Sequence, residues 1–257
     1  AACSCEKRQM NEQQIYSGPS TWYGPQMAKS REWIHSFSTA EINELMAAAD
    51  ASEGRDIVSL DAEAFELPQL DSILAGIRAE ILRGRGFVIL RGLPVQDWSM
   101  SRIVRVYWAI TSRIGVPIAQ NSIGNLLGHV TDVGGDAQNP EQRAHQSKGA
   151  LPFHTDISAE VVGLLCIRGA RSGGESALAS VSALWNEMVA TRPDLAATLT
   201  HIFHLDRRGD EVEGQKPWFS MPVLVAGKSA VHVCHNPRFV RSAQRFPGLP
   251  RLTEIQE

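Results

Sequence analysis

Apolar residues recur every three or four positions in the first half of the chain, which is the spacing of one face of an α-helix. The clearest start signal is Ser38-Thr39-Ala40-Glu41, which matches a capping box and predicts a helix over about 39–52. Two further periodic runs predict helices over 67–83, ended by Gly84 or Gly86, and from a cap at Asp97 to the residue before Gly115. Two short apolar runs predict strands at 57–60 and 87–90.

The pattern changes near residue 117. Short apolar segments separated by Gly, Pro, Asn and Asp replace the long periodic runs, as in all-β barrels and sandwiches. Helices interrupt them near 181–191, from Pro193 onward, and after His235-Asn236-Pro237. The expected strands lie near 117–120, 126–131, 161–168, 176–180, 202–206, 221–226 and 230–234.

Helices followed by strands predict an α+β fold, a jelly roll with an N-terminal helical layer. Residues 1–36 are polar and punctuated by Gly and Pro, so we expect an irregular N-terminal arm whose aromatic residues attach it to the body. Residues 37–257 are expected to form one domain, because no linker or repeat divides them.

The composition of the chain excludes some classes of function. A hydrophobic fraction of 43% in 257 residues can fill a substantial core, and a net charge of -3 without a long basic block gives no electrostatic footprint for nucleic acid. No apolar run approaches the roughly 18 to 20 residues that span a bilayer. We therefore expect a soluble cytoplasmic protein whose partner is a small molecule.

The four cysteines match no zinc site or disulfide framework. Cys3 and Cys5 are expected to be ordinary thiols in a frayed terminus. Cys166 lies in the apolar run 161–168 and is predicted to be a core residue.

The stretch His154-Thr155-Asp156 carries the candidate chemistry. On an extended backbone, side chains two residues apart point to the same side, so an imidazole and a carboxylate at this spacing can reach one metal ion. They would supply two of the three ligands of a 2-His-1-carboxylate iron site. Such a short pattern is expected about once by chance in this composition, and His204-Leu205-Asp206 also fits it. The second match precedes a polar turn, Arg207-Arg208-Gly209-Asp210, and is predicted to be a solvated hairpin.

Several other motifs stand in a fixed order around His154-Thr155-Asp156. From about residue 18 to the end, the chain resembles the taurine dioxygenase (TauD/TfdA-type) family of Fe(II)/2-oxoglutarate-dependent oxygenases. The motifs that carry the resemblance are Gly86-Phe87-Val88-Ile89-Leu90-Arg91-Gly92-Leu93-Pro94, Gly115-Val116-Pro117, Gln120-Asn121, Leu151-Pro152-Phe153-His154-Thr155-Asp156, Leu164-Leu165-Cys166-Ile167-Arg168, Ser172-Gly173-Gly174-Glu175-Ser176 and Arg192-Pro193-Asp194-Leu195.

The resemblance implies a double-stranded β-helix in which His154, Asp156 and a distant second histidine hold Fe(II). It implies a dioxygenase that uses O2 and 2-oxoglutarate to hydroxylate or desaturate a small organic substrate, with release of succinate and CO2. Ser176 would contact 2-oxoglutarate, where the family usually has a threonine. Gln120 and Asn121 either line the same pocket or satisfy the end of a strand.

One part of the family pattern is not evident. The family places its second histidine on a late strand and, some ten to fifteen residues later, an arginine that grips the distal carboxylate of 2-oxoglutarate. We expect both to be absent here, and the domain to lack its last strands and to be incomplete at the C-terminus. His235 with Arg245 imitates the spacing, and His232 is a second in-chain candidate, whereas His129 and His145 precede the motif.

Two other functions remain open. A chain without the third ligand can be a catalytically inactive β-helix protein that binds a small ligand or partner. A zinc hydrolase could use His154 and Asp156 with His232 or His235, although no general-base motif supports it.

Overall fold

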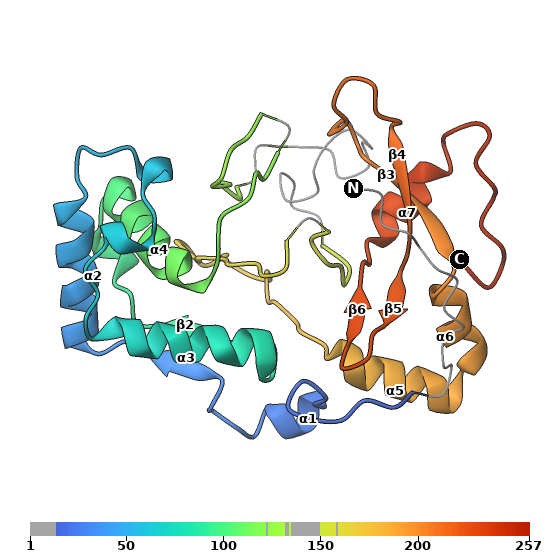
Figure 1. Ribbon diagram of the computed structural model, residues 1–257, viewed down its shortest axis with the longest axis horizontal. Helices are drawn as coiled ribbons and strands as arrows, with labels where there is room; N and C mark the ends of the chain where they lie inside the picture. Colours follow the sequence, from blue (N-terminus) through green and yellow to red (C-terminus); the bar gives the residue numbers. More distant parts are fainter. Residues whose placement is uncertain (1–13, 122, 132–133, 135–149, 158) are drawn as a thin grey trace. The chain divides into compact units, whose positions relative to one another are not determined.

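The computed structural model describes residues 14–121, 123–131, 134, 150–157 and 159–257 (Figure 1). The chain divides into two compact units. The helical unit comprises residues 24–130 and 158–177, and the hairpin unit comprises residues 1–23, 131–157 and 178–257. Each unit has its own hydrophobic core.

Three helices build the helical unit: α2 (Thr39–Ala51), α3 (Leu70–Arg83) and α4 (Met100–Ile114). Both α2 and α3 pack against α4, and their core side chains are fully buried at Leu45, Leu74 and Val106. The capping box predicted at the start of α2 is confirmed: Ser38 Oγ accepts a hydrogen bond from the Glu41 amide, and the Glu41 carboxylate accepts one from the Ser38 amide. A short helix, α1 (Gly24–Met27), precedes them.

The strands of this unit differ from the prediction. β1 (Ile34–Ser36) pairs in parallel with β2 (Ile89–Arg91), so the strand expected at 87–90 begins two residues later. The strand expected at 57–60 is wrong. That segment forms the 3₁₀ helix η1 (Ile57–Ser59), because the Asp56 carboxylate accepts from the Val58 amide and caps a helical turn. A second 3₁₀ helix, η2 (Ala62–Ala64), follows it.

The cap predicted for the third helix is also wrong. Asp97 ends a 3₁₀ turn, η3 (Val95–Asp97), and Ser99 caps α4 instead, with its hydroxyl accepting from the Arg102 amide. Both residue types suit an N-cap. Because Asp97 belongs to η3, it cannot cap α4, and the N-cap of α4 lies two residues later, at Ser99.

In the described residues of the hairpin unit there are three helices and two antiparallel strand pairs. Its helices are α5 (Val181–Thr191), α6 (Pro193–Leu199) and α7 (Pro237–Ala243), each close to the position expected from the sequence. β3 (Ile202–Asp206) pairs with β4 (Trp218–Pro222), and β5 (Leu224–Ala226) pairs with β6 (Val231–Val233). Figure 1 shows the β5–β6 hairpin standing on α5, and α7 packed against β3.

The core of the hairpin unit forms between these elements and includes Trp185, Phe203 and Leu205. The N-terminal segment joins it through Tyr16, whose hydroxyl donates to the Gly227 carbonyl oxygen at 2.7 Å. The Asn186 side chain accepts from the Tyr16 amide and donates to the Tyr16 carbonyl oxygen, so α5 holds this segment as a neighbouring strand would.

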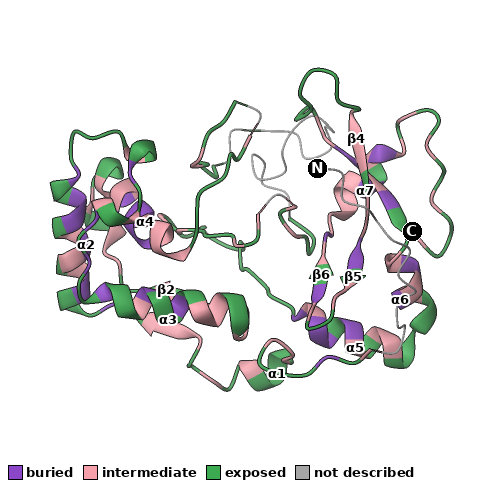
Figure 2. Cartoon of the chain, viewed as in Figure 1, coloured by how far each residue is buried: buried purple, intermediate pink, exposed green. Residues whose placement is uncertain are grey.

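Four expected strands are not formed. The described residues of 117–120, 126–131, 161–168 and 176–180 lie in neither helix nor strand. In Figure 2 the described segments between α4 and α5 are green and pink, and no described residue of 115–179 is buried. A strand needs a hydrogen-bonded neighbouring strand, and the described part of the chain supplies none to these segments.

Apolar side chains therefore lie open to solvent in this stretch, among them Val116 at 88% and Leu164 at 79% exposed. Cys166 is exposed as well, so the prediction that it is a core residue is wrong. The described fold is mixed helix and strand, as expected, with its strands in three two-stranded sheets.

Of the helices that the structure describes, none combines the length and apolar character needed to cross a membrane.

Candidate metal-binding segment

His154-Thr155-Asp156 belongs to the hairpin unit and lies in a segment without helix or strand. Exposure alternates along it: His154 and Asp156 are exposed, and Thr155 between them is half-buried. This alternation is what an extended backbone produces. The imidazole and the carboxylate are thus both accessible to a ligand from solvent.

The ring of His154 is oriented by its own chain. Nδ1 lies 2.8 Å from the Pro152 carbonyl oxygen. Because a carbonyl oxygen can only accept, the ring nitrogen must carry the proton and donate to it. The Nε2 lone pair of neutral His154 then stays available to a metal ion, which is the arrangement that second-shell hydrogen bonds impose on ligating histidines.

Thr155 is hydrogen-bonded twice to His235, the second residue after β6. Its amide donates to the His235 carbonyl oxygen at 2.7 Å, and its Oγ1 accepts from the His235 amide at 2.9 Å. Burial, and then the neighbouring His154, lower the pKa of the His235 imidazole. The start of the same segment is held by α7, where Arg238 Nη2 donates to the Ala150 carbonyl oxygen at 3.0 Å.

A buried carboxylate in turn fixes α7. Asp206, at the end of β3, is completely buried and accepts hydrogen bonds from Ser242 Oγ and from Arg245 Nε, the latter at 2.9 Å. Helix α7 is therefore attached to β3 at one end and to the segment at 150–155 at the other.

The prediction that the second His-x-Asp match is a solvated hairpin is wrong at Asp206, which lies in the core of its unit. His204 contacts Ser220 across the β3–β4 pair, with Nδ1 and Oγ 2.7 Å apart. The turn that follows is only partly solvated, since the guanidinium groups of Arg207 and Arg208 lie over the rings of Phe219 and Phe239 at 5.0 and 5.6 Å.

The residues expected to contact 2-oxoglutarate belong to the helical unit. Gln120 and Asn121 make local contacts: Gln120 Nε2 donates to the Ile118 carbonyl oxygen at 2.9 Å, and Asn121 Oδ1 accepts from the Asn125 amide at 3.0 Å. These bonds close a local turn, and no strand ends there, so the structure shows neither of the two roles that the sequence left open. Ser176 is exposed, in a segment without helix or strand.

His154 and Asp156 fit ferrous iron in ligand type, because imidazole and carboxylate are the donors of a facial triad. Among the residues that the structure describes, no group of three His, Cys, Asp or Glu side chains is placed to hold a metal ion. His232 is exposed on β6, His129 is exposed in its loop, and Arg245 is paired with Asp206. Cys3, Cys5 and His145 lie outside the described residues.

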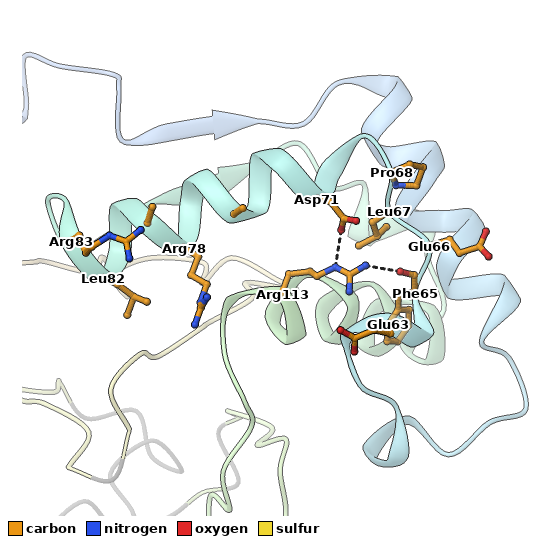
Figure 3. Close-up of a pocket in the computed structure, with 12 residues that line it drawn as sticks. Glu63, Phe65, Glu66, Leu67, Pro68, Asp71, Arg78, Leu82, Arg83 and Arg113 are labelled. Carbon is orange, nitrogen blue, oxygen red and sulfur yellow. Dashed lines mark hydrogen bonds and ion pairs between the residues drawn. The ribbon is translucent and has the colours of Figure 1, made fainter.

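A separate cavity of about 870 Å³ lies in the helical unit (Figure 3). Phe65, Leu67 and Leu82 supply its apolar wall, and neither histidine nor cysteine lines it. Figure 3 shows Arg113 reaching from α4 to two groups across the cavity: its Nε donates to Asp71 Oδ1 and its Nη2 to the Phe65 carbonyl oxygen, both at 2.8 Å. These contacts join α4 to α3 and to the segment at Phe65, and they occupy guanidinium nitrogens of Arg113 that a ligand would otherwise need.

Comparison with known proteins agrees with the resemblance seen in the sequence. Residues 53–255 match the family described as Taurine catabolism dioxygenase TauD, TfdA family. The chain is 26% identical over 204 residues to FR-33289 synthase of Streptomyces rubellomurinus (strain ATCC 31215), a match that covers 78% of this chain. It is 30% identical over 241 residues to taurine hydroxylase-like protein SAT17 of Stachybotrys chartarum (strain CBS 109288 / IBT 7711), covering 90% of this chain.

The chain spans 60% of the length of each of these two relatives. The family match, in contrast, takes in the greater part of the chain, including the His154 segment, α5, α7 and all the strands of the hairpin unit. The chain therefore belongs to the taurine catabolism dioxygenase TauD, TfdA family.

Proposed function

We propose that this chain acts as an Fe(II)/2-oxoglutarate-dependent dioxygenase that oxidises a small organic substrate by hydroxylation or desaturation. The observation that carries the proposal is the geometry at 154–156: two exposed donors, His154 and Asp156, flank a residue held from the other side by His235. Membership of the family supplies the reaction class.

In this proposal His154 binds the metal through Nε2, with Nδ1 donating to the Pro152 carbonyl oxygen. Asp156 adds a negative charge that lowers the net charge of the site. When bound, the iron would supply the oxidative chemistry, with O2 and 2-oxoglutarate consumed and succinate and CO2 released. The protein's own part is to hold the two donors at a fixed spacing with an open face beside them.

The 2-oxoglutarate contacts are proposed from the family pattern. The Ser176 hydroxyl can donate to a carboxylate, and the Gln120 and Asn121 amides can do the same once their local bonds are exchanged. The names of the two relatives point to hydroxylation and to biosynthesis, and both are compatible with a small organic substrate.

The test is 2-oxoglutarate-dependent succinate release by the folded chain supplied with Fe²⁺ and O2. The proposal predicts release from the unsubstituted protein and loss of at least about 100-fold in His154→Ala and Asp156→Ala, since removal of a ligand removes the metal. His204→Ala is the matched control, because it removes the histidine of the other His-x-Asp match. Turnover that survives substitution at both 154 and 156 would exclude the proposed ligands.

The rival function, a non-catalytic protein that binds a ligand or partner, predicts a different result. The folded chain would then retain no iron and release no succinate.

A further inference from the structure

The pair of hydrogen bonds between Thr155 and His235 is not explained by chain folding nearby, because the two residues are separated by 80 positions. One bond is backbone to backbone, and the other uses the threonine hydroxyl as acceptor for a backbone amide. Any residue except proline could make the first bond. Only a side chain with an oxygen at this position could make the second.

The two bonds act on the residue between the candidate ligands. The two bonds tie Thr155 to the chain after β6, and its neighbours His154 and Asp156 lie on the exposed side. Arg238, three residues after His235, adds a third bond to the Ala150 carbonyl oxygen. The segment 150–156 is thus held at both ends by the stretch 235–238.

That stretch is itself rigidly supported. Asn236 caps α7 by accepting from the Phe239 amide, and the far end of α7 is bonded to the buried Asp206. Side chains that hold metal ligands through such contacts commonly affect metal affinity by about 10- to 100-fold.

From this geometry we propose that Thr155 is a positioning residue: its hydroxyl, bonded to the His235 amide, fixes the spacing and direction of His154 and Asp156 for one divalent metal ion. The inference rests on the proposed function, since it assumes that these two residues bind the metal. It assigns a separate role to a side chain that would not touch the metal.

Three variants of the full chain test the role, with Co²⁺ as the probe and its affinity measured by calorimetry. Thr155→Val keeps the shape and removes the acceptor, and it should weaken Co²⁺ binding about 10-fold. Thr155→Ser keeps the hydroxyl and should bind as the unsubstituted chain does. Thr198→Val is the matched control, because Thr198 is a buried threonine of α6 whose hydroxyl donates to the Asp194 carbonyl oxygen; it should leave the affinity unchanged.

Hydrogen exchange gives a second reading that needs no metal. The His235 amide should exchange faster in Thr155→Val than in Thr155→Ser, because the valine cannot accept its hydrogen bond. If the valine variant does not fold, Thr155→Ala removes the same acceptor without adding a buried methyl group.

Equal Co²⁺ affinity in the valine and serine variants would overturn the positioning role, as would an equal loss in Thr198→Val or unchanged exchange of the His235 amide. The proposed function stands in each of these cases if the unsubstituted chain binds Co²⁺ and His154→Ala binds it at least about 10-fold more weakly. If the unsubstituted chain binds no Co²⁺, both proposals are contradicted.

Discussion

Asp206 and Arg245 form an ion pair in which the two partners differ sharply in exposure: the carboxylate side chain is 0% exposed and the guanidinium side chain 38%. The pair joins the end of β3 to the residues just after α7, with Arg245 Nε 2.9 Å from Asp206 Oδ2. The Arg208 amide also donates to Asp206 Oδ1 at 2.8 Å. Loss of the cation and loss of the anion should therefore have unequal consequences.

We predict that Arg245→Met destabilises the protein more than Asp206→Asn does. The methionine leaves a buried carboxylate without its ion-pair partner, and we expect this to lower the free energy of unfolding by about 2–3 kcal/mol. The loss lies at or just below the usual range for a broken buried ion pair, because Arg245 is partly exposed to solvent. The asparagine still accepts from the Arg208 amide and leaves a guanidinium that water can reach, at a cost of about 1–2 kcal/mol. Urea unfolding of the two variants measures the difference, and the reverse order would contradict this view of the pair.

Stability should fall at alkaline pH because of two tyrosines. Burial raises the pKa of Tyr16 and of Tyr107, whose hydroxyls donate to the carbonyl oxygens of Gly227 and Gly163. The unfolded chain ionises these groups near pH 10, whereas the folded chain keeps its protons. The unfolded state thus binds fewer protons as the pH rises through about 10, and the free energy of unfolding decreases.

Urea unfolding at pH 8 and at about pH 10.5 checks this prediction. Tyr107→Phe should lose less stability between the two pH values than the unsubstituted chain, since one of the two groups is gone. An identical loss in both proteins would show that Tyr107 does not contribute.

Arg113 should stabilise the helical unit more than an exposed arginine of the same helix. Its side chain is 17% exposed and is bonded both to Asp71 and to the Phe65 carbonyl oxygen, as Figure 3 shows. We expect Arg113→Ala to cost about 1.5–2.5 kcal/mol, because a charged hydrogen bond and a buried carbonyl partner are lost together. Arg102→Ala, which removes a half-exposed pair with Asp50, should cost less than about 1 kcal/mol.

The comparison between the two variants is made by thermal or urea unfolding. Equal costs would mean that the bond to the Phe65 carbonyl oxygen adds nothing.

The helices could be predicted from the sequence because their signals are local. The capping box at Ser38 and Glu41 lies within four residues, and the proline that opens α6 sets its own backbone angle. Where two local signals compete, the prediction fails by a few residues, as with Asp97 and Ser99 at the start of α4.

Strand prediction was less successful because a strand depends on its neighbours. β3 was placed correctly because its apolar residues are covered by α7 and paired with β4. The run at 161–168 is also rich in apolar residues, but the described part of the chain gives it no paired neighbour, and it does not form a strand.

In the candidate site too, features that depend on neighbouring residues could be predicted from the sequence, and contacts between distant residues could not. The proposal that His154 and Asp156 are metal ligands depends only on their spacing of two residues in one segment. Both side chains are exposed in the structure, which agrees with the proposal but does not test metal binding. The contact of Thr155 with His235 spans 80 residues and that of Asp206 with Arg245 spans 39, so no pattern of neighbouring residues could indicate them. Asp206 looked solvated because two arginines and a glycine follow it in the sequence.

The most direct test of the account is anaerobic Fe²⁺ binding by the folded chain, with His154→Ala, Asp156→Ala and His204→Ala compared under the same conditions. The account predicts one Fe²⁺ per chain, affinity lowered by about 10-fold or more in each of the first two variants, and no change in the third. A chain that binds Fe²⁺ equally well after substitution at 154 or 156, or that binds none while fully folded, would contradict it.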